Sequence, residues 1–63
     1  MERIFLKPGV YDTLDNPYMK LHVGDFSPCE VIVIEKSSDG IVANASNREK
    51  IPVRIFVSYA QVA

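Results

Sequence analysis

The fold is decided by the stretch Cys29–Ala45, which reads CEVIVIEKSSDGIVANA. Its β-branched run Val31–Ile34 lies between charged residues, a pattern typical of a strand that is buried on at least one face. The segment Ser37–Gly40 supplies turn chemistry, because Asp39 can hydrogen-bond its own backbone and Gly40 can adopt the positive φ that a tight reversal needs. We expect Gly40 to have a positive φ. Apolar residues then alternate with other residues along the rest of the stretch. We therefore predict a β-hairpin here.

Alternation of apolar and polar residues predicts further strands on both sides of this hairpin. A first short apolar stretch occupies residues 4–6. Alternation then runs through residues 19–23, and it is most regular through residues 51–57. Pro52 cannot donate a ladder hydrogen bond, so we expect it at the start of its strand or on a sheet edge. Nowhere do apolar residues recur with the period of a helix over three turns. The chain is therefore predicted to be all-β.

Turns separate these predicted strands. Residues 7–10 carry the Pro-Gly pair of a type II turn, so Gly9 is expected to have a positive φ. Residues 15–18 form a second turn, because Pro17 excludes the residue before it from the helical region. Residues 58–61 are expected to make one short helical turn.

These elements predict a single domain, residues 1–63, built as a small five-stranded antiparallel barrel, open or closed on itself. Orthogonal packing or closure is how such a chain hides its strand edges. At 63 residues the core must be small, since a domain of this size buries only about 60% of its unfolded surface. The residues expected to hold it together are Ile4, Leu6, Met19, Leu21, Val23, Val31, Val33, Ile41, Ala43, Ile51, Val53 and Ile55.

Composition limits the classes of function. The formal net charge is −1, which argues against a non-specific nucleic-acid binder. No apolar run approaches the ~20 residues of a membrane span, so no membrane partner is expected. The single cysteine, Cys29, excludes an internal disulfide and a cysteine-based zinc site. A small domain without a disulfide suits a reducing, cytoplasmic compartment.

Residues that carry catalytic chemistry are sparse. His22 is the single histidine and points away from the apolar side of its strand, which favours a solvated or partner-facing ring. Cys29 is expected to be a small core residue. The three glycines lie in separate turns, so there is no phosphate-binding loop. We expect no enzymatic activity, no metal and no cofactor.

The order of motifs resembles that of the Src homology 3 (SH3) domain. Val10-Tyr11-Asp12 is similar to the family's alanine-leucine-tyrosine-aspartate opening, and residues 21–25 to its diverging turn. Residues 33–40 are similar to the strand and loop that precede the family's ligand-binding tryptophan. Residues 57–59 lie at its terminal short helix, and Val62 where its last strand begins. Ile41 stands in place of the tryptophan, so tight binding of generic proline-rich peptides is not expected.

The resemblance implies a tyrosine-rich face that binds a larger protein through a peptide or loop. Tyrosine combines apolar area with a hydroxyl and is enriched at interfaces. The carboxylates on this face would favour a basic residue of the partner. The residues expected to form the face are Tyr11, Asp12, Asp15, Pro17, Tyr18, Ile41 and Tyr59.

Two alternatives from other classes stay open. One is a nucleic-acid-associated barrel that uses Lys7, Lys20, Lys36, Arg48, Lys50 and Arg54. The other is a structural subunit that assembles through exposed strand edges, including as a homo-oligomer. The expected function is a non-catalytic protein-binding module, or a small free-standing protein that modulates a larger partner.

Overall fold

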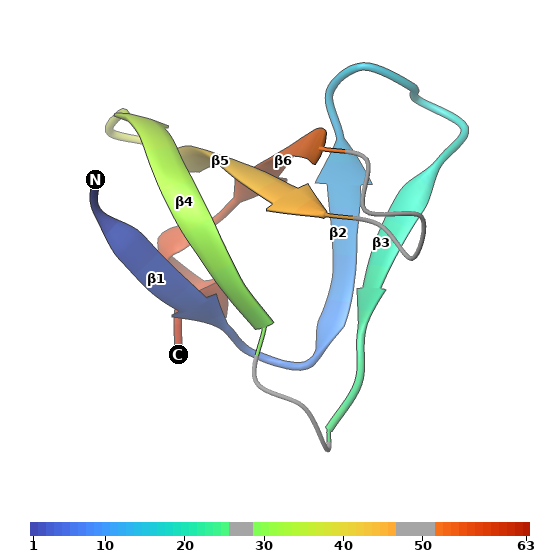
Figure 1. Ribbon diagram of the computed structural model, residues 1–63, viewed down its shortest axis with the longest axis horizontal. Helices are drawn as coiled ribbons and strands as arrows, with labels where there is room; N and C mark the ends of the chain where they lie inside the picture. The colour runs from blue at the N-terminus through green and yellow to red at the C-terminus, as the bar shows by residue number, and fades with distance from the viewer. Residues whose placement is uncertain (26–28, 47–51) are drawn as a thin grey trace.

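The computed structural model describes residues 1–25, 29–46 and 52–63. These ranges contain six β-strands and one 3-10 helix (Figure 1). The elements are β1 (Arg3–Leu6), β2 (Gly9–Thr13), β3 (Lys20–Val23), β4 (Cys29–Lys36), β5 (Ile41–Ser46), β6 (Pro52–Val57) and η1 (Tyr59–Gln61).

All six strands form one curved antiparallel sheet with the order β1-β4-β5-β6-β2-β3. The prediction of an all-β fold is confirmed, but the predicted number of five strands is wrong. The additional strand is β2, where a turn and loop were expected. Tyr11 and Thr13 are the buried residues of β2. Because both carry hydroxyl groups, the segment does not show the alternation of apolar and polar residues that predicts a strand. The sheet is also not closed, since β1 and β3 are its outer strands.

The predicted central hairpin is confirmed as β4 and β5. The two strands pair from Ile32 opposite Asn44 to Lys36 opposite Ile41, with a register shift between Val33 and Glu35. The turn is closed by the backbone N–H of Ser37, which donates to the carbonyl of Gly40 at 2.9 Å. Pro52 begins β6, as its missing N–H predicted.

The two glycine predictions have different outcomes. Gly9 has a φ of 152°, so its predicted positive φ is confirmed. Gly40 does not have a positive φ, and that prediction is wrong. The position needs glycine for another reason: a Cβ there would lie 2.5 Å from both Phe56 Cζ and the carbonyl oxygen of Val57. Glycine is therefore required at position 40 by close packing against β6, and not by its backbone conformation.

The core is formed by side chains from β1, β2, β4, β5 and β6. Five of the residues predicted for it are buried, and a further five pack against them half-buried, namely Ile4, Leu21, Val23, Val33 and Val53. Met19 is 42% exposed, because β3 begins only at Lys20 and leaves Met19 in the preceding loop. Ile51 lies outside the described residues. The buried apolar residues are Leu6, Tyr11, Val31, Ile41, Ala43, Ala45, Ile55 and Val57.

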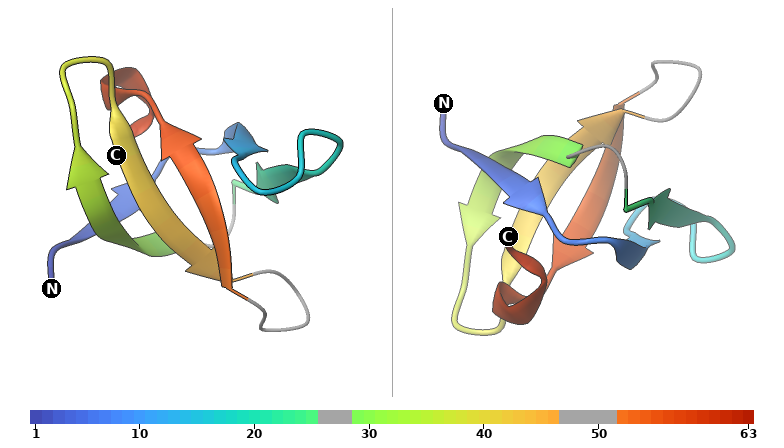
Figure 2. Two further views of the ribbon diagram at one scale, coloured as in Figure 1. Left: turned by 90° about the horizontal axis from the view of Figure 1, so that it is seen from above. Right: turned by 90° about the horizontal axis from the view of Figure 1, so that it is seen from below.

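The C-terminal segment covers the outer edge of β1. After η1, which confirms the predicted helical turn, Val62 forms an antiparallel bridge with Leu6. The Lys7 N–H donates to the Gln61 carbonyl at 2.9 Å, and the Ala63 N–H donates to the Phe5 carbonyl at 2.8 Å. Figure 2 shows the C-terminus lying beside β1, whereas β3 is at the far side of the sheet. One outer strand is thus covered and the other is not, within the described part of the chain.

Tyr11 joins the core to this C-terminal segment. Its side chain is only 1% exposed, and its hydroxyl donates to the Lys7 carbonyl at 2.5 Å and lies 3.3 Å from that of Gln61. Burial raises the pKa of the Tyr11 phenol above its ordinary value of 10.0, and the nearby Cys29 raises it further. Burial likewise raises the pKa of the Cys29 thiol above 9.0.

These two raised pKa values predict alkaline destabilisation. In the unfolded chain the groups ionise near 9.0 and 10.0, whereas the folded protein keeps them protonated to higher pH. Their stabilisation is therefore complete below pH 9.0 and is lost as the pH rises through the unfolded and then the folded pKa values. We expect the urea midpoint to fall above that pH. The variant Tyr11→Phe/Cys29→Ala should show a much flatter profile; an equally steep fall in that variant would contradict the assignment.

Candidate functional site

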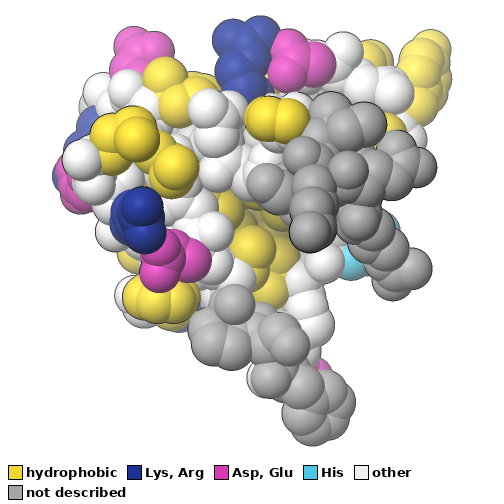
Figure 3. All heavy atoms as spheres, viewed as in Figure 1, with side chains coloured by type: hydrophobic (Ala, Val, Ile, Leu, Met, Phe, Trp, Pro, Cys, Tyr) yellow, Lys and Arg dark blue, Asp and Glu magenta, His cyan; other side chains and the backbone are white. Residues whose placement is uncertain are grey.

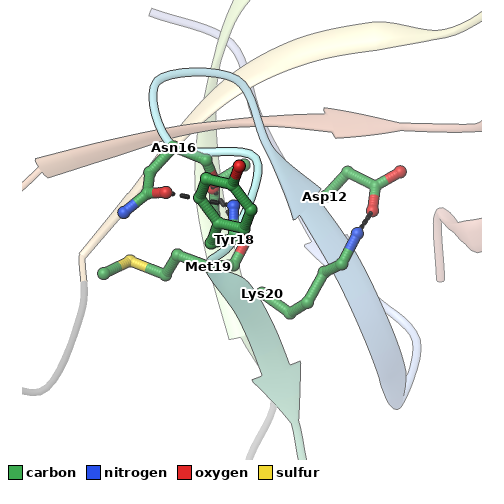
Figure 4. Close-up of polar contacts among 6 residues, drawn as sticks. Asp12, Asn16, Tyr18, Met19 and Lys20 are labelled. Carbon is green, nitrogen blue, oxygen red and sulfur yellow. Dashed lines mark hydrogen bonds and ion pairs between the residues drawn. The ribbon is translucent and has the colours of Figure 1, made fainter.

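In the loop that joins β2 to β3, residues 14–19, short polar side chains hydrogen-bond to the backbone. The hydroxyl of Thr13 lies 2.5 Å from the Asn16 carbonyl oxygen and 2.9 Å from that of Met19. The Asn16 side-chain oxygen accepts the Tyr18 N–H at 3.0 Å, and the Asn16 carbonyl accepts the Met19 N–H at 3.0 Å (Figure 4). Pro17 fixes φ inside this turn, as the sequence predicted. We call residues 14–19 the β2–β3 loop.

The β2–β3 loop exposes apolar surface. Tyr18 is 96% exposed, Leu14 is 46% exposed and Met19 is 42% exposed, and Pro17 between them is exposed as well. In Figure 3, hydrophobic side-chain atoms project at the upper right corner, where Figure 1 places this loop. Single exposed apolar residues are ordinary, but here they gather within six consecutive positions of one ordered loop.

Two ion pairs flank this apolar surface. The Lys20 ammonium contacts the Asp12 carboxylate across the β2–β3 hairpin (Figure 4). Arg54 on β6 donates to the two carboxylate oxygens of Asp15 at 2.5 and 3.3 Å. Hydrogen bonding to the Arg54 guanidinium holds the pKa of the Asp15 carboxyl below its ordinary value. Both carboxylates of the predicted face therefore already have cationic partners within the chain.

The structure brings together only part of the predicted face. Asp12, Asp15, Pro17 and Tyr18 lie on or next to the β2–β3 loop. Figures 1 and 2 place η1, which carries Tyr59, at the opposite end of the molecule from this loop.

Tyr11 and Ile41 are in the core, so neither presents its side chain to a partner. Tyr59 is 49% exposed and donates its hydroxyl to the Ser37 carbonyl at 2.5 Å, so it holds η1 against the β4–β5 turn. The expectation that three tyrosines share one face is corrected by these positions. Their spacing in the sequence did not show that β2 turns Tyr11 inward.

Sequence reasoning missed two apolar residues of the loop. Leu14 received no role, and Met19 was assigned to the core by its parity with Leu21. The available signal was their position on either side of Asn16-Pro17, since a turn at that point takes both residues out of the strands.

Most of the described basic side chains are paired with carboxylates. Arg3 contacts Glu30 at 3.1 Å and Lys36 contacts Glu2 at 2.6 Å, in addition to the pairs made by Lys20 and Arg54. Lys7 donates to the Ala60 carbonyl at 3.0 Å. Arg48 and Lys50 lie outside the described residues. In the ranges that the structure describes, the basic residues proposed to bind nucleic acid therefore form no continuous stripe of unpaired cations.

Titratable side chains are scattered through residues 1–25, 29–46 and 52–63. No group of three or more His, Cys, Asp or Glu side chains in these ranges is placed to hold a metal ion. His22 is exposed on β3, and Cys29 is half-buried at the start of β4, where it packs against the core. Over the same ranges, no helix has the length and apolar character needed to cross a membrane.

Comparison with protein-family models, with curated proteins and with solved structures finds no match to this chain.

Proposed function

We propose that this protein is a non-catalytic module that binds a larger protein through its β2–β3 loop. The observation that carries the proposal is the 96% exposure of Tyr18 on a loop whose backbone is fixed by Thr13 and Asn16. Aromatic side chains are the commonest anchors of protein interfaces. An anchor held on an ordered loop also loses little conformational entropy on binding, which increases its contribution to affinity.

The surroundings of Tyr18 match the anatomy of an interface. Leu14, Pro17 and Met19 extend the apolar centre, and the Asp12–Lys20 and Asp15–Arg54 pairs provide a polar rim. Interfaces combine an apolar centre with such a rim. Because surface ion pairs are weak, a partner's charged groups can exchange with them at small cost.

We further propose an SH3-like architecture. It is supported by the antiparallel series β4, β5 and β6, by η1 directly after β6, and by the bridge from Val62 to Leu6. These features follow the order of the motifs that resemble the SH3 domain. Ile41, at the position of the family's tryptophan, is buried, which supports the expectation that generic proline-rich peptides bind weakly.

Among the alternatives, assembly through a strand edge is favoured by one observation. β3 pairs with β2 and with no other strand of the described chain. The nucleic-acid alternative has no comparable support, because its described cations are mostly paired.

The Tyr18→Ala variant tests the loop directly. Since truncation of a central anchor costs above about 2 kcal/mol, we expect Tyr18→Ala to weaken binding of the protein partner at least tenfold. The measurement is calorimetric titration of the partner recovered by affinity capture from the source cells. The matched control is Tyr59→Ala, a half-exposed tyrosine at the other end of the molecule, which should change the affinity little. A loss of affinity in Tyr59→Ala but not in Tyr18→Ala would refute the proposal.

A further inference from the structure

The outer edge of β3 is a second notable surface. β3 pairs with β2 from Gly9 opposite Val23 to Asp12 opposite Lys20, and no other strand of the described residues pairs with its opposite side. The other outer strand, β1, is covered by the bridge between Leu6 and Val62. An open strand edge presents backbone donors and acceptors that can pair with an added strand.

The side chains of β3 indicate what an added strand should contain. Leu21 and Val23 are half-buried and pack against the core, whereas Lys20 and His22 are exposed on the other face. An added strand would continue both faces, because directly opposed residues in a ladder point to the same side. It would therefore need apolar residues opposite Leu21 and Val23, and polar residues opposite Lys20 and His22.

The charge on the exposed face favours carboxylates at those polar positions. Lys20 already contacts Asp12 on β2, but an ammonium group has three N–H donors and can bind a second carboxylate on its free side. The row across the sheet would then alternate in sign, from Asp12 through Lys20 to the new carboxylate. His22 has the exposed Val10 opposite it on β2, so it has no carboxylate directly across the ladder.

The same charges disfavour a second copy of this chain as the added strand. If two β3 strands pair over residues 20–23 with their exposed faces on the same side, Lys20 meets Lys20 or His22 of the other copy and no carboxylate. The register that sets Lys20 against Lys20 opposes two positive charges. Opposed like charges destabilise a ladder, and charged side chains on edge strands protect proteins from self-association.

We propose that β3 binds an extended segment of the protein partner in which apolar residues alternate with acidic ones, as an added strand of the sheet. Tyr18 and Met19 directly precede β3 in the chain, so a segment lying along β3 would also contact the β2–β3 loop. The inference rests on the proposed protein-binding function and specifies the chemistry of the partner and the mode of recognition.

The test uses two capped synthetic peptides of equal length, one alternating valine with glutamate and the other alternating valine with lysine. Titration of the ¹⁵N-labelled full chain should shift the amide signals of residues 20–23 with the glutamate peptide. That peptide should bind about tenfold more tightly than the lysine peptide, because the residue opposite Lys20 is a carboxylate in the first peptide and a like-charged ammonium group in the second. Equal affinities, or shifts centred away from β3, would overturn the proposal.

The variant Lys20→Gln/His22→Gln provides the matched control, because it removes the Lys20 ammonium group and the His22 ring and keeps polar side chains of similar reach at both positions. The preference for the glutamate peptide should disappear; if the preference persists, the charges of β3 do not select the segment. With the captured partner, the same variant separates the two proposals. If Tyr18→Ala loses the partner and this variant keeps it at full affinity, the function stands and the β3 mode fails.

Discussion

Gly40→Ala is expected to lower the free energy of unfolding by about 3 kcal/mol, near the upper end of the usual cost of overpacking. The new Cβ would lie 2.5 Å from both the Phe56 ring and the Val57 carbonyl oxygen. The carbonyl cannot move without disturbing β6, which carries the fully buried Ile55 and Val57. Urea unfolding followed by circular dichroism measures the change.

Gly24→Ala is the matched control. Apart from Gly24 and its two chain neighbours, no heavy atom of the described residues lies within 4 Å of the Cβ that this substitution would add, and Gly24 has no positive φ. The substitution should therefore change the free energy of unfolding by less than about 0.5 kcal/mol, or raise it slightly, because alanine lowers the conformational entropy of the unfolded chain. Equal effects at Gly24 and Gly40 would show that close packing against β6 is not what requires glycine at position 40.

Tyr11→Ala is expected to remove about 4 kcal/mol, because it deletes the largest fully buried side chain of the described core. A chain of 63 residues has a total stability of roughly 3–9 kcal/mol, so the variant should lose between nearly half and all of its free energy of unfolding and should melt at a much lower temperature. Tyr11→Phe keeps the ring and loses only the hydroxyl contacts with Lys7 and Gln61, at a cost of about 1 kcal/mol.

Tyr18→Ala provides the comparison for Tyr11→Ala, since it makes the same chemical change at a side chain that is 96% exposed. Its effect on stability should stay within about 0.5 kcal/mol. Thermal melts of the three variants at equal concentration are sufficient. If the Tyr11→Ala protein has the same melting temperature as the wild type, the placement of Tyr11 in the core is contradicted.

Much of the fold could be predicted because its signals are local. The β-branched run Val31–Ile34, followed by turn residues, fixed the central hairpin, and Pro52 marked the start of β6. What could not be predicted depends on long-range contacts. Gly40 was singled out for a backbone conformation that it does not adopt, because its actual constraint is the approach of β6, which is distant in sequence.

The candidate site divides in the same way. Asp12, Asp15, Pro17 and Tyr18 lie within one hairpin, so sequence alone could bring them together. Whether Tyr59 and Ile41 belong with them depended on the curvature of the whole sheet. Tyr11 was the hardest case, since an amphipathic ring fits a surface and a core equally well. Its burial follows from backbone acceptors supplied by Lys7 and Gln61, at the two ends of the chain.

Site-specific photocrosslinking tests most directly that the β2–β3 loop is the binding surface. The photoreactive amino acid p-benzoylphenylalanine replaces Tyr18 in one preparation and Tyr59 in another, and each is irradiated with the captured partner. Both positions are exposed, at 96% and 49%, and the segments that carry them, the β2–β3 loop and η1, lie on opposite sides of the molecule (Figures 1 and 2). We expect a covalent adduct with the partner from position 18 and none from position 59. An adduct from position 59 alone, or from neither position, would contradict binding through this loop.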